Sequence, residues 1–541
     1  MPQTGLRGEV MKRREFLKSA AAVPVAGALA PALLAKDVAA AERADEIKVA
    51  QATTGSPAAK PTAGSTPAIP PDELGKALVT TDMNGTGPDG AHNGQTATFS
   101  GESKAGTAAG TATAKMELTD DEQAVLDDRD GPEKAKLMQI LVKFGETFGA
   151  TKLVDLGGAP HSNLYIGAAY LGSIIDLLEE CANAGLKSYA PYTVNPRPYD
   201  VYNVQNNPTD IQLIYEGYPL QMKLDWVHSQ LGAPDLNQRS CACYLAEVGN
   251  APEPGTNVAW CESSAVNYGN SVLGVRTNRY GAGMEMVCAM LGKAPYYGLM
   301  TDEGRKAKWL IDVKTSSEPD WGALGAAIGR NCVEDIPYVA GVQQYIGDEV
   351  TVDNMWKLKK MGSTTAAEGA VGCYHVEGVT PEPKEKGRDM LVEGFQTYVY
   401  DDAEEQRILD TWQNLWPEKD GDPTAAFIGC PHNTYQEVLT WCQNVTDALN
   451  KAGQEKTAIP VYMFMPTVVR TRMLLEHPAL ASKSLDAGMH YTNMCAVSYS
   501  GMKGFSERTR GVTNSAKTRA YSTIRYFPDK KLVDIIVTGK V

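Results

Sequence analysis

The chain has 541 residues, of which 43% are apolar, so it can bury a large core in two or three domains. Its formal charge is −14 and its basic residues are not clustered, which argues against nucleic acid as a partner. No apolar run after the N-terminus is long enough to span a bilayer. An anionic substrate would need a locally positive site in so acidic a protein.

The N-terminus carries a predicted export signal. Lys12-Arg13-Arg14-Glu15-Phe16-Leu17-Lys18 matches the twin-arginine motif, a modest apolar stretch runs from Ala20 to Ala35, and three alanines at 39–41 suit cleavage. We expect residues 1–41 to be a signal peptide for the twin-arginine export machinery, and the protein to be periplasmic or otherwise exported. That route carries folded proteins, which suits a chain that must receive a cofactor before export.

Residues 42–115 are rich in Ala, Thr, Gly, Pro and Ser and contain almost no aromatic side chains. Such a composition cannot bury enough apolar surface to offset the entropy lost on ordering. We therefore expect a disordered tether over 42–115 and a folded body over 116–541.

The folded body alternates helical and strand patterns, which predicts an α/β fold with parallel layers. Thr119 and Glu122 form a capping box, and Pro132 starts a second helix with an apolar face of Leu137, Ile140, Leu141, Phe144 and Phe148. Predicted elements then follow in this order: a strand over 152–156, a loop with His161, a helix over 163–184 and a strand over 188–194.

The stretch Trp260–Arg279 has no core-like apolar stripe and is crowded with polar side chains. Its serines, asparagines and two arginines fit a cleft for a small, oxygen-rich anion, because arginine binds a carboxylate or phosphate through two hydrogen bonds. A Ser/Asn-rich connection between two helices explains the same composition equally well.

Residues 425–432 predict a strand, a turn and a helix start, followed by a helix over 435–451 with Gly453 as its C-cap. This pattern places Cys430 at a helix N-terminus, where backbone amides stabilise a thiolate. Further alternation leads to Cys495. An even count of ten cysteines in an exported chain first suggests disulfides, but their spacing does not resemble a small stapled scaffold. Metal or cluster ligation by a few of them, with the rest as buried thiols, is at least as well supported.

Several ordered motifs over about residues 117–541 resemble the aconitase X family of iron–sulfur dehydratases, which includes mevalonate 5-phosphate dehydratase and cis-3-hydroxyproline dehydratase. The motifs are Cys241-Ala-Cys-Tyr-Leu, Val258-Ala-Trp-Cys-Glu-Ser-Ser-Ala-Val, Asn270-Ser-Val-Leu-Gly-Val-Arg-Thr-Asn-Arg, Gly292-Lys-Ala-Pro-Tyr-Tyr-Gly-Leu, Ala370-Val-Gly-Cys-Tyr-His-Val-Glu-Gly-Val-Thr-Pro-Glu, Gly429-Cys-Pro-His and Thr513-Asn-Ser-Ala-Lys. The resemblance implies aconitase-like parallel sheets with helices, in two or three subdomains around a central cleft.

The resemblance also implies a site. An iron–sulfur cluster ([4Fe-4S], [3Fe-4S] or [2Fe-2S]) would be held by Cys241, Cys430 and Cys495, leaving one iron open to act as a Lewis acid on a small anionic hydroxy acid. The expected catalytic residues are Glu262, Ser263, Ser264, Ser515 and Lys517. The expected substrate contacts are Asn195, Asn270, Ser271, Arg276, Thr277, Asn278, Arg279 and His375.

The chain departs from the family pattern in several places. Cys243 stands where the family has proline, and Cys261 where it has alanine, so either could ligate the cluster, pair or pack. Ala516 replaces a glycine, and Asn493 and Met494 replace the usual residues before Cys495. The remaining thiols are interpreted as buried: Cys181, Cys288, Cys332, Cys373 and Cys442.

The family's small swivelling domain is also missing from this chain, which implies a separate small subunit. The resemblance therefore predicts a hydro-lyase that a second protein completes. Two alternatives stay open: an exported non-catalytic or electron-transfer iron–sulfur protein on the same fold, and a cluster-free solute-binding cleft.

Overall fold

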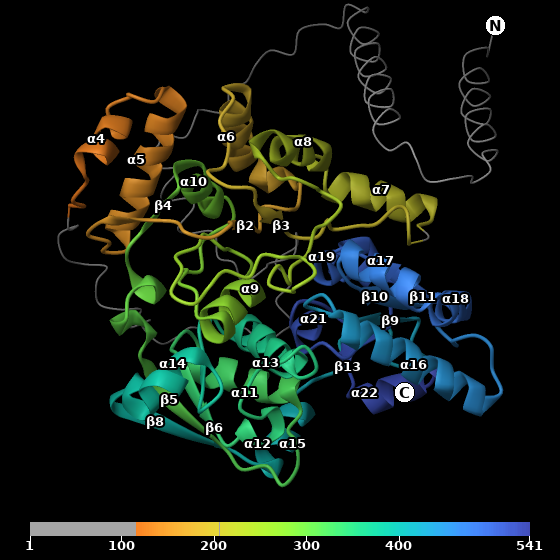
Figure 1. Ribbon diagram of the computed structural model, residues 1–541. Coiled ribbons are helices and arrows are strands. Elements are labelled where there is room, and N and C mark those ends of the chain that lie inside the picture. Colours follow the sequence, from red (N-terminus) through yellow and green to blue (C-terminus); the bar gives the residue numbers. More distant parts are fainter. Residues whose placement is uncertain (1–114, 205) are drawn as a thin grey trace, which may run out of the picture. The chain divides into compact units, whose positions relative to one another are not determined.

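The computed structural model describes residues 115–204 and 206–541 (Figure 1). The predicted signal peptide, and the predicted tether up to residue 114, lie outside the described residues. Between 116 and 541 the predicted α/β class with parallel sheets is confirmed. None of the helices in the described ranges is both long and apolar enough to cross a membrane.

The first part of the body is mainly helical, with two small sheets. Strand β1 pairs antiparallel with β4, and β2 pairs parallel with β3. The elements are α4 (Asp120–Leu126), α5 (Pro132–Thr147), β1 (Leu153–Asp155), β2 (His161–Ser162), α6 (Gly172–Asn183), β3 (Thr193–Val194), α7 (Pro208–Gly217), α8 (Gln221–Leu231), α9 (Ser263–Tyr268), α10 (Met284–Leu291) and β4 (Lys293–Pro295).

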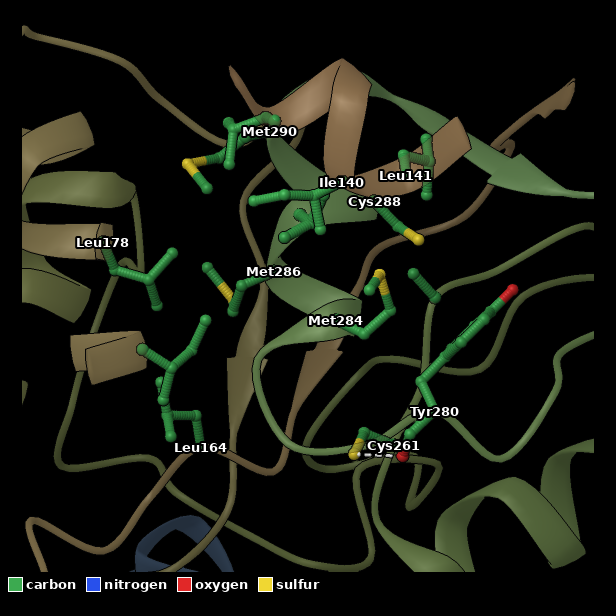
Figure 2. Packing of buried hydrophobic residues seen from close by; sticks show 14 of the residues in the cluster. Ile140, Leu141, Leu164, Leu178, Cys261, Tyr280, Met284, Met286, Cys288 and Met290 are labelled. Atoms are coloured by element: carbon green, nitrogen blue, oxygen red, sulfur yellow. Dashed lines mark hydrogen bonds between the residues drawn. The ribbon is translucent and has the colours of Figure 1, made fainter. Parts of the chain in front are cut away.

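The core of this part is built around α10. Met284, Met286 and Cys288 of α10 pack against Ile140 and Leu141 of α5 (Figure 2). The capping box of Thr119 and Glu122 is present, as predicted. Phe148 was expected on the buried face of α5, but it lies beyond the last turn of the helix and is partly exposed, while the other four predicted residues are buried.

The second part contains a parallel four-stranded sheet in the order β7-β6-β5-β8. Helix α13 packs between α11, which follows β5, and α9 of the first part. The elements are β5 (Ala307–Val313), α11 (Trp321–Cys332), β6 (Pro337–Ala340), α12 (Gln343–Ile346), α13 (Met355–Glu368), β7 (His375–Val376), α14 (Pro381–Lys386), β8 (Leu391–Tyr400) and α15 (Asp402–Asp410).

The third part contains a parallel five-stranded sheet in the order β11-β10-β9-β12-β13. The elements are β9 (Ala425–Ile428), α16 (Tyr435–Ala452), β10 (Val461–Phe464), α17 (Thr467–Glu476), α18 (Pro478–Ala487), β11 (Met489–Thr492), α19 (Ala496–Ser500), α20 (Lys503–Ser506), β12 (Gly511–Thr513), α21 (Ala516–Ala520), β13 (Arg525–Tyr526) and α22 (Asp529–Thr538).

This third sheet has a point where the direction of winding reverses. From β9 the chain moves to β10 and β11 on one side, and then returns to β12 and β13 on the other side. In an open parallel sheet, a crevice forms outside the carboxyl ends of the strands at such a reversal, and ligands bind there. The fold therefore favours a site beyond the carboxyl ends of β9 and β12.

Helix α16 begins at Tyr435, with Thr434 and Glu437 as a capping box and Gly453 as C-cap, so its predicted extent is confirmed. The prediction that Cys430 sits at the start of this helix is wrong. The N-cap of this helix is Thr434, whose hydroxyl accepts a hydrogen bond from the Glu437 amide in the first turn. Pro431 therefore lies upstream of the cap and outside the helix. Cys430 lies in the turn between β9 and the cap.

Candidate functional site

Two of the predicted cysteines lie at the carboxyl edge of the third sheet. Cys430 follows β9 and Cys495 follows β11, while Ser515 follows β12. Because all these strands are parallel, the segments that follow them emerge at the same edge. The Ser515 hydroxyl donates a hydrogen bond to the Cys430 carbonyl across 2.6 Å, which joins the two segments on either side of the reversal point.

Cys241 joins these two cysteines from the first part of the body. The backbone amide of His432 donates to the Cys241 sulfur at 3.3 Å. Burial raises the pKa of the Cys241 thiol well above its usual value, and the negative charges of Glu262, Cys430 and Cys495 raise it further. The three cysteines therefore converge, although they are far apart in the sequence.

All ten cysteines lie within the described residues, and Cys241, Cys430 and Cys495 are the three that are not fully buried. The predicted buried thiols Cys181, Cys288, Cys332, Cys373 and Cys442 are buried. Cys243 and Cys261 are buried as well, and the Cys261 thiol donates to the Tyr280 carbonyl at 2.8 Å (Figure 2). The three partly exposed thiols are the ones that a bound group could reach.

Hydrogen-bond donors surround the Cys495 sulfur. The Ser498 amide donates to this sulfur at 3.4 Å, and the Tyr165 hydroxyl lies 3.7 Å from it and 2.8 Å from the Ser498 hydroxyl. Donors to sulfur stabilise the thiolate, which is the form that binds a metal. Tyr165 follows the predicted His161 loop, but nothing in the sequence marks it as a site residue.

A buried ion pair lies beside the three thiols. The Lys517 ammonium donates to Glu262 Oε1 at 2.6 Å and to the Ser263 hydroxyl at 3.0 Å. Glu262 Oε2 accepts from the Ser264 hydroxyl at 2.5 Å and from the Ala265 amide at 2.7 Å, so this carboxylate caps α9. This charge pair therefore connects the first and third parts of the body.

The pKa shifts of this pair favour the charged forms. Burial opposes the charge on Glu262, but the charge of Lys517 and the hydrogen bonds to the carboxylate outweigh it and lower the Glu262 pKa. Burial likewise opposes the charge on Lys517, and Glu262 and Cys430 outweigh it and raise the Lys517 pKa. At Cys430, burial raises the thiol pKa to about 11, and Lys517 acts in the opposite direction.

His161 and Asn195 lie on the same side of the site. His161 Nε2 lies 2.9 Å from Asn195 Oδ1, and its Nδ1 lies 2.9 Å from the Thr193 hydroxyl. Burial lowers the His161 pKa to about 4, while the charge of Glu262 raises it, so the imidazole lies within electrostatic reach of that carboxylate. Asn195 thus orients a neutral histidine next to the ion pair.

The two predicted arginines separate. Arg276 turns towards Asp302, with which it forms an ion pair, and donates to the Met300 carbonyl at 2.9 Å. The charge of Arg279 instead acts on the Tyr521 hydroxyl, as do the charges of Lys517, Glu262 and Cys430. Arg279 therefore lies within electrostatic reach of the same tyrosine as Lys517, Glu262 and Cys430, whereas Arg276 is paired with Asp302.

Four other polar residues of this stretch are engaged in structural hydrogen bonds. Asn270 bonds the backbone of Thr277 and Gly372, and the Ser271 hydroxyl accepts from the Tyr374 amide at 2.8 Å. The Thr277 hydroxyl accepts from the Trp260 amide, and the Asn278 amide group binds the backbone around Tyr297 and Leu299. These contacts hold buried loops together, and the role of Asn270, Ser271, Thr277 and Asn278 as substrate contacts stays a prediction.

His375 lies in a different buried cluster. Together with Cys373 and Glu382 it forms a group whose ligand atoms lie within 4.8 Å of one another. Arg305, however, binds the Glu382 carboxylate through its Nε at 2.9 Å and its Nη2 at 2.8 Å, so a second cation there would meet like charge. His375 Nε2 faces the Arg305 carbonyl at 2.8 Å. We interpret this cluster as structural, and His375 does not join the thiols.

Comparison with known proteins supports this fold. The family model described as the aconitase X first domain matches residues 115–303, and that of the aconitase X second domain matches residues 307–409. A phosphomevalonate dehydratase large subunit from Methanothermobacter thermautotrophicus is 34% identical over 60% of this chain and 75% of its own length. A cis-3-hydroxy-L-proline dehydratase from Pseudomonas aeruginosa is 31% identical over 58% of this chain, which spans about half (52%) of that relative.

A solved structure shares the fold. The crystal structure of Thermococcus kodakaraensis aconitase X in its holo-form superposes with a TM-score of 0.63 and 26% identity, covering 78% of this chain and all of the other. Fold and relatives together define an α/β enzyme of the hydro-lyase class. More particularly, the chain belongs to the aconitase X family.

The buried ion pair generates a stability prediction. Lys517→Met leaves the Glu262 carboxylate buried without its partner, so we expect it to lower the free energy of unfolding by about 3–5 kcal/mol. Lys517→Met combined with Glu262→Gln should recover most of this loss, because no charge then stays buried alone. Urea unfolding of the three proteins checks this; equal losses in the single and double variants would contradict it.

The same pair has a predictable pH dependence. Its contribution is fully present between the ordinary pKa values of glutamate and lysine, about 4.3 and 10.4. It is lost as pH falls through the lowered pKa of Glu262 or rises through the raised pKa of Lys517. The stability difference between wild type and the double variant should therefore stay constant over about pH 6–9 and shrink below about pH 4.

Proposed function

We propose that this chain is the cluster-binding subunit of a dehydratase that removes water from a small hydroxy acid. The observation that carries the proposal is the convergence of Cys241, Cys430 and Cys495 beside the ion pair of Glu262 and Lys517. Relatives named as dehydratases support the reaction class. The phosphomevalonate and hydroxyproline of those names supply two candidate substrates.

The three thiols fit an iron–sulfur cluster by their chemistry. They come from separate segments, keep partial exposure, and two of their sulfurs already receive backbone N–H donors. The Tyr244 hydroxyl is buried without a hydrogen-bond partner, and its pKa responds to the charges of Cys241 and Glu262, so it can serve a bound group. When bound through three cysteines, a [4Fe-4S], [3Fe-4S] or [2Fe-2S] cluster supplies a Lewis acid to the substrate hydroxyl.

Electron transfer is the less supported alternative. A fourth cysteine ligand is the usual arrangement for that role. Cys243 is the cysteine placed by sequence to supply it, and its side chain is completely buried. A set of three accessible thiols favours catalysis.

The chain's own residues can hold and move protons next to the thiols. The Ser264 hydroxyl donates to Glu262 Oε2 at 2.5 Å, so a proton that arrives at Ser264 Oγ has a direct path to that carboxylate. Lys517 keeps Glu262 ionised and ready to accept it. The Ser263 and Ser264 hydroxyls accept the other hydrogen bonds of the ammonium. Ser515 has a positioning role instead, because its hydroxyl joins the Cys430 carbonyl to the Thr518 amide.

We assign substrate binding to Arg279, and Asn195 to the orientation of His161, which lies within electrostatic reach of Glu262. An anionic group held by the Arg279 guanidinium would lie near Lys517 and Tyr521, in a locally positive part of an acidic chain. The hydroxyl of a bound acid would then face the thiols.

A separate small subunit is part of the proposal. The Methanothermobacter relative is named a large subunit, and this chain covers 75% of it. The Pseudomonas relative carries no such name, and its match to this chain covers 52% of its length. The simplest account is that the Pseudomonas enzyme contains both parts in a single chain, whereas the Methanothermobacter enzyme assembles them from two chains.

Iron binding tests the proposal directly. Cys241→Ala, Cys430→Ala and Cys495→Ala, purified under argon, should each lose most of the visible absorption and iron of the wild type, because each removes one ligand. Cys332→Ala, a buried thiol in α11, should keep both. A colourless, iron-free wild type would falsify the cluster assignment.

The separation of the two arginines predicts different kinetics. In the assembled enzyme, Arg279→Lys should raise KM at least about tenfold, because a charge-assisted contact with an anion is worth about 1.5–3 kcal/mol. Arg276→Lys should change KM less than about twofold, since Arg276 binds Asp302 and Met300. Steady-state assays with mevalonate 5-phosphate and cis-3-hydroxy-L-proline measure both. The reverse ranking would remove Arg279 from the site.

We also propose export by the twin-arginine route, on the motif at 12–18, which lies outside the described residues. Replacing both Arg13 and Arg14 by lysine should leave the full-length protein in the cytoplasm of its host, because the machinery reads the arginine pair. Cell fractionation with immunoblotting measures this, and unchanged export of the double variant would contradict it.

A further inference from the structure

A group of large apolar side chains is exposed on the first part of the body. Its members are Tyr170, Tyr202, Ile211, Tyr215, Met222 and Trp226, and we call them the α7–α8 surface. Tyr202 is 89% exposed, Met222 85%, Tyr215 73% and Tyr170 65%. Scattered single apolar residues are normal on a protein surface, but a concentration of them marks a binding site. Tyrosine, tryptophan and methionine are moreover the types enriched in protein interfaces.

Neighbouring segments carry these residues. Ile211 and Tyr215 are four residues apart on α7, and Met222 and Trp226 are four residues apart on α8, so each pair shares one helix face. Helices α7 and α8 are consecutive and joined by a short turn (Figure 1). Tyr170 belongs to a single helical turn (Ala169–Leu171), and the preceding Gly167 is tied to the start of α8 by hydrogen bonds to Leu220 and Gln221.

The α7–α8 surface adjoins the thiol-lined site. The Tyr218 hydroxyl, at the end of α7, donates to the Ser498 carbonyl at 3.0 Å. Burial raises the Tyr218 pKa, and the charges of both Cys495 and Tyr170 add to it, so this tyrosine lies within electrostatic reach of both groups. Asp210 of α7 pairs with Arg508 at 2.5 Å. The inner face of α7 therefore rests on the segment that begins at Cys495, and its outer face is exposed.

The geometry points to the α7–α8 surface as the docking site of the small subunit. This inference rests on the proposed function, because the occupant is the separate protein that corresponds to the additional length of the Pseudomonas relative. Three partly exposed thiols need a cover that excludes water from the reacting atoms. An apolar, aromatic surface at their rim would hold such a cover, and Tyr215 and Met222 would supply the central contacts.

Two other occupants, the segment 42–114 and a second copy of the chain, fit the α7–α8 surface less well. Residues 42–114 of the same chain have few apolar side chains to match an aromatic surface. A second copy of the chain would have to bring its own apolar face, and would leave the thiols without the part that the longer relative possesses. The small subunit is the occupant that accounts for both the exposed surface and the length of the Pseudomonas relative outside its match to this chain.

Site-specific crosslinking with a matched binding assay tests the docking site. The probe is the protein of the native host whose sequence matches the segment of the Pseudomonas cis-3-hydroxy-L-proline dehydratase that lies outside its match to this chain. A photoreactive phenylalanine analogue at position 215 should form an adduct with this probe. Tyr215→Ser combined with Met222→Ser should weaken the apparent Kd at least about 30-fold, because both residues are proposed hot spots.

The matched control is Val352→Ser combined with Leu475→Ser, two exposed apolar residues on other elements, and it should bind within about twofold of the wild type. Unchanged binding in the Tyr215/Met222 variant would overturn the docking site, as would an adduct with residues 42–114 or with a second copy. Iron content of the wild type separates the two proposals. A cluster-containing chain that binds the probe elsewhere refutes only the surface, and an iron-free chain that binds at position 215 refutes only the cluster.

Discussion

The buried pair of Lys517 and Glu262 is the interaction on which the site depends. It joins α21, which follows β12, to the cap of α9 in the first part of the body. Burying either charge alone is costly, so the two segments are stable only together. The charge of Glu262 acts on the Cys241 thiol and the charge of Lys517 acts on the Cys430 thiol, so the pair lies within electrostatic reach of both.

The sheet explains why such distant residues meet. Parallel strands deliver their following segments to one edge, and the reversal between β9 and β12 leaves room there. Cys430, Cys495 and Ser515 all use this edge, whereas Cys241 comes from a loop that the His432 amide contacts. The same arrangement leaves the thiols partly exposed, which is consistent with an enzyme that a second protein completes.

The polar stretch between Trp260 and Arg279 has two roles that its composition does not separate. Its first residues, from Glu262 to Ser264, face Lys517, and Arg279 at its end acts on the same region. Most of the residues between are buried, and Asn270 and Ser271 bind loop backbones through their side chains. Buried polar groups need hydrogen-bond partners. Here the buried asparagine and serine side chains bond the backbone of irregular loops, which have no neighbouring strand to do so.

The sequence by itself determined the local elements and the family. The capping boxes, the helix from Tyr435, the strand–helix alternation and the ordered motifs all depend on residues near one another in the chain, so their patterns can be read directly. It also singled out the three cysteines, through the resemblance to aconitase X. The sequence did not reveal that Tyr165 lies beside the Cys495 sulfur or that Phe148 is exposed, because no local pattern marks either residue.

The tertiary structure decided which polar side chains face the site. Arg276 and Arg279 look equivalent in the sequence, but Asp302 holds the first and the second acts beside Tyr521. His375 carries the family motif, yet Arg305 and Glu382 hold it in another cluster. The orientation of each of these side chains depends on a partner many residues away in the sequence. Such partners come together only when the three parts of the body pack against one another.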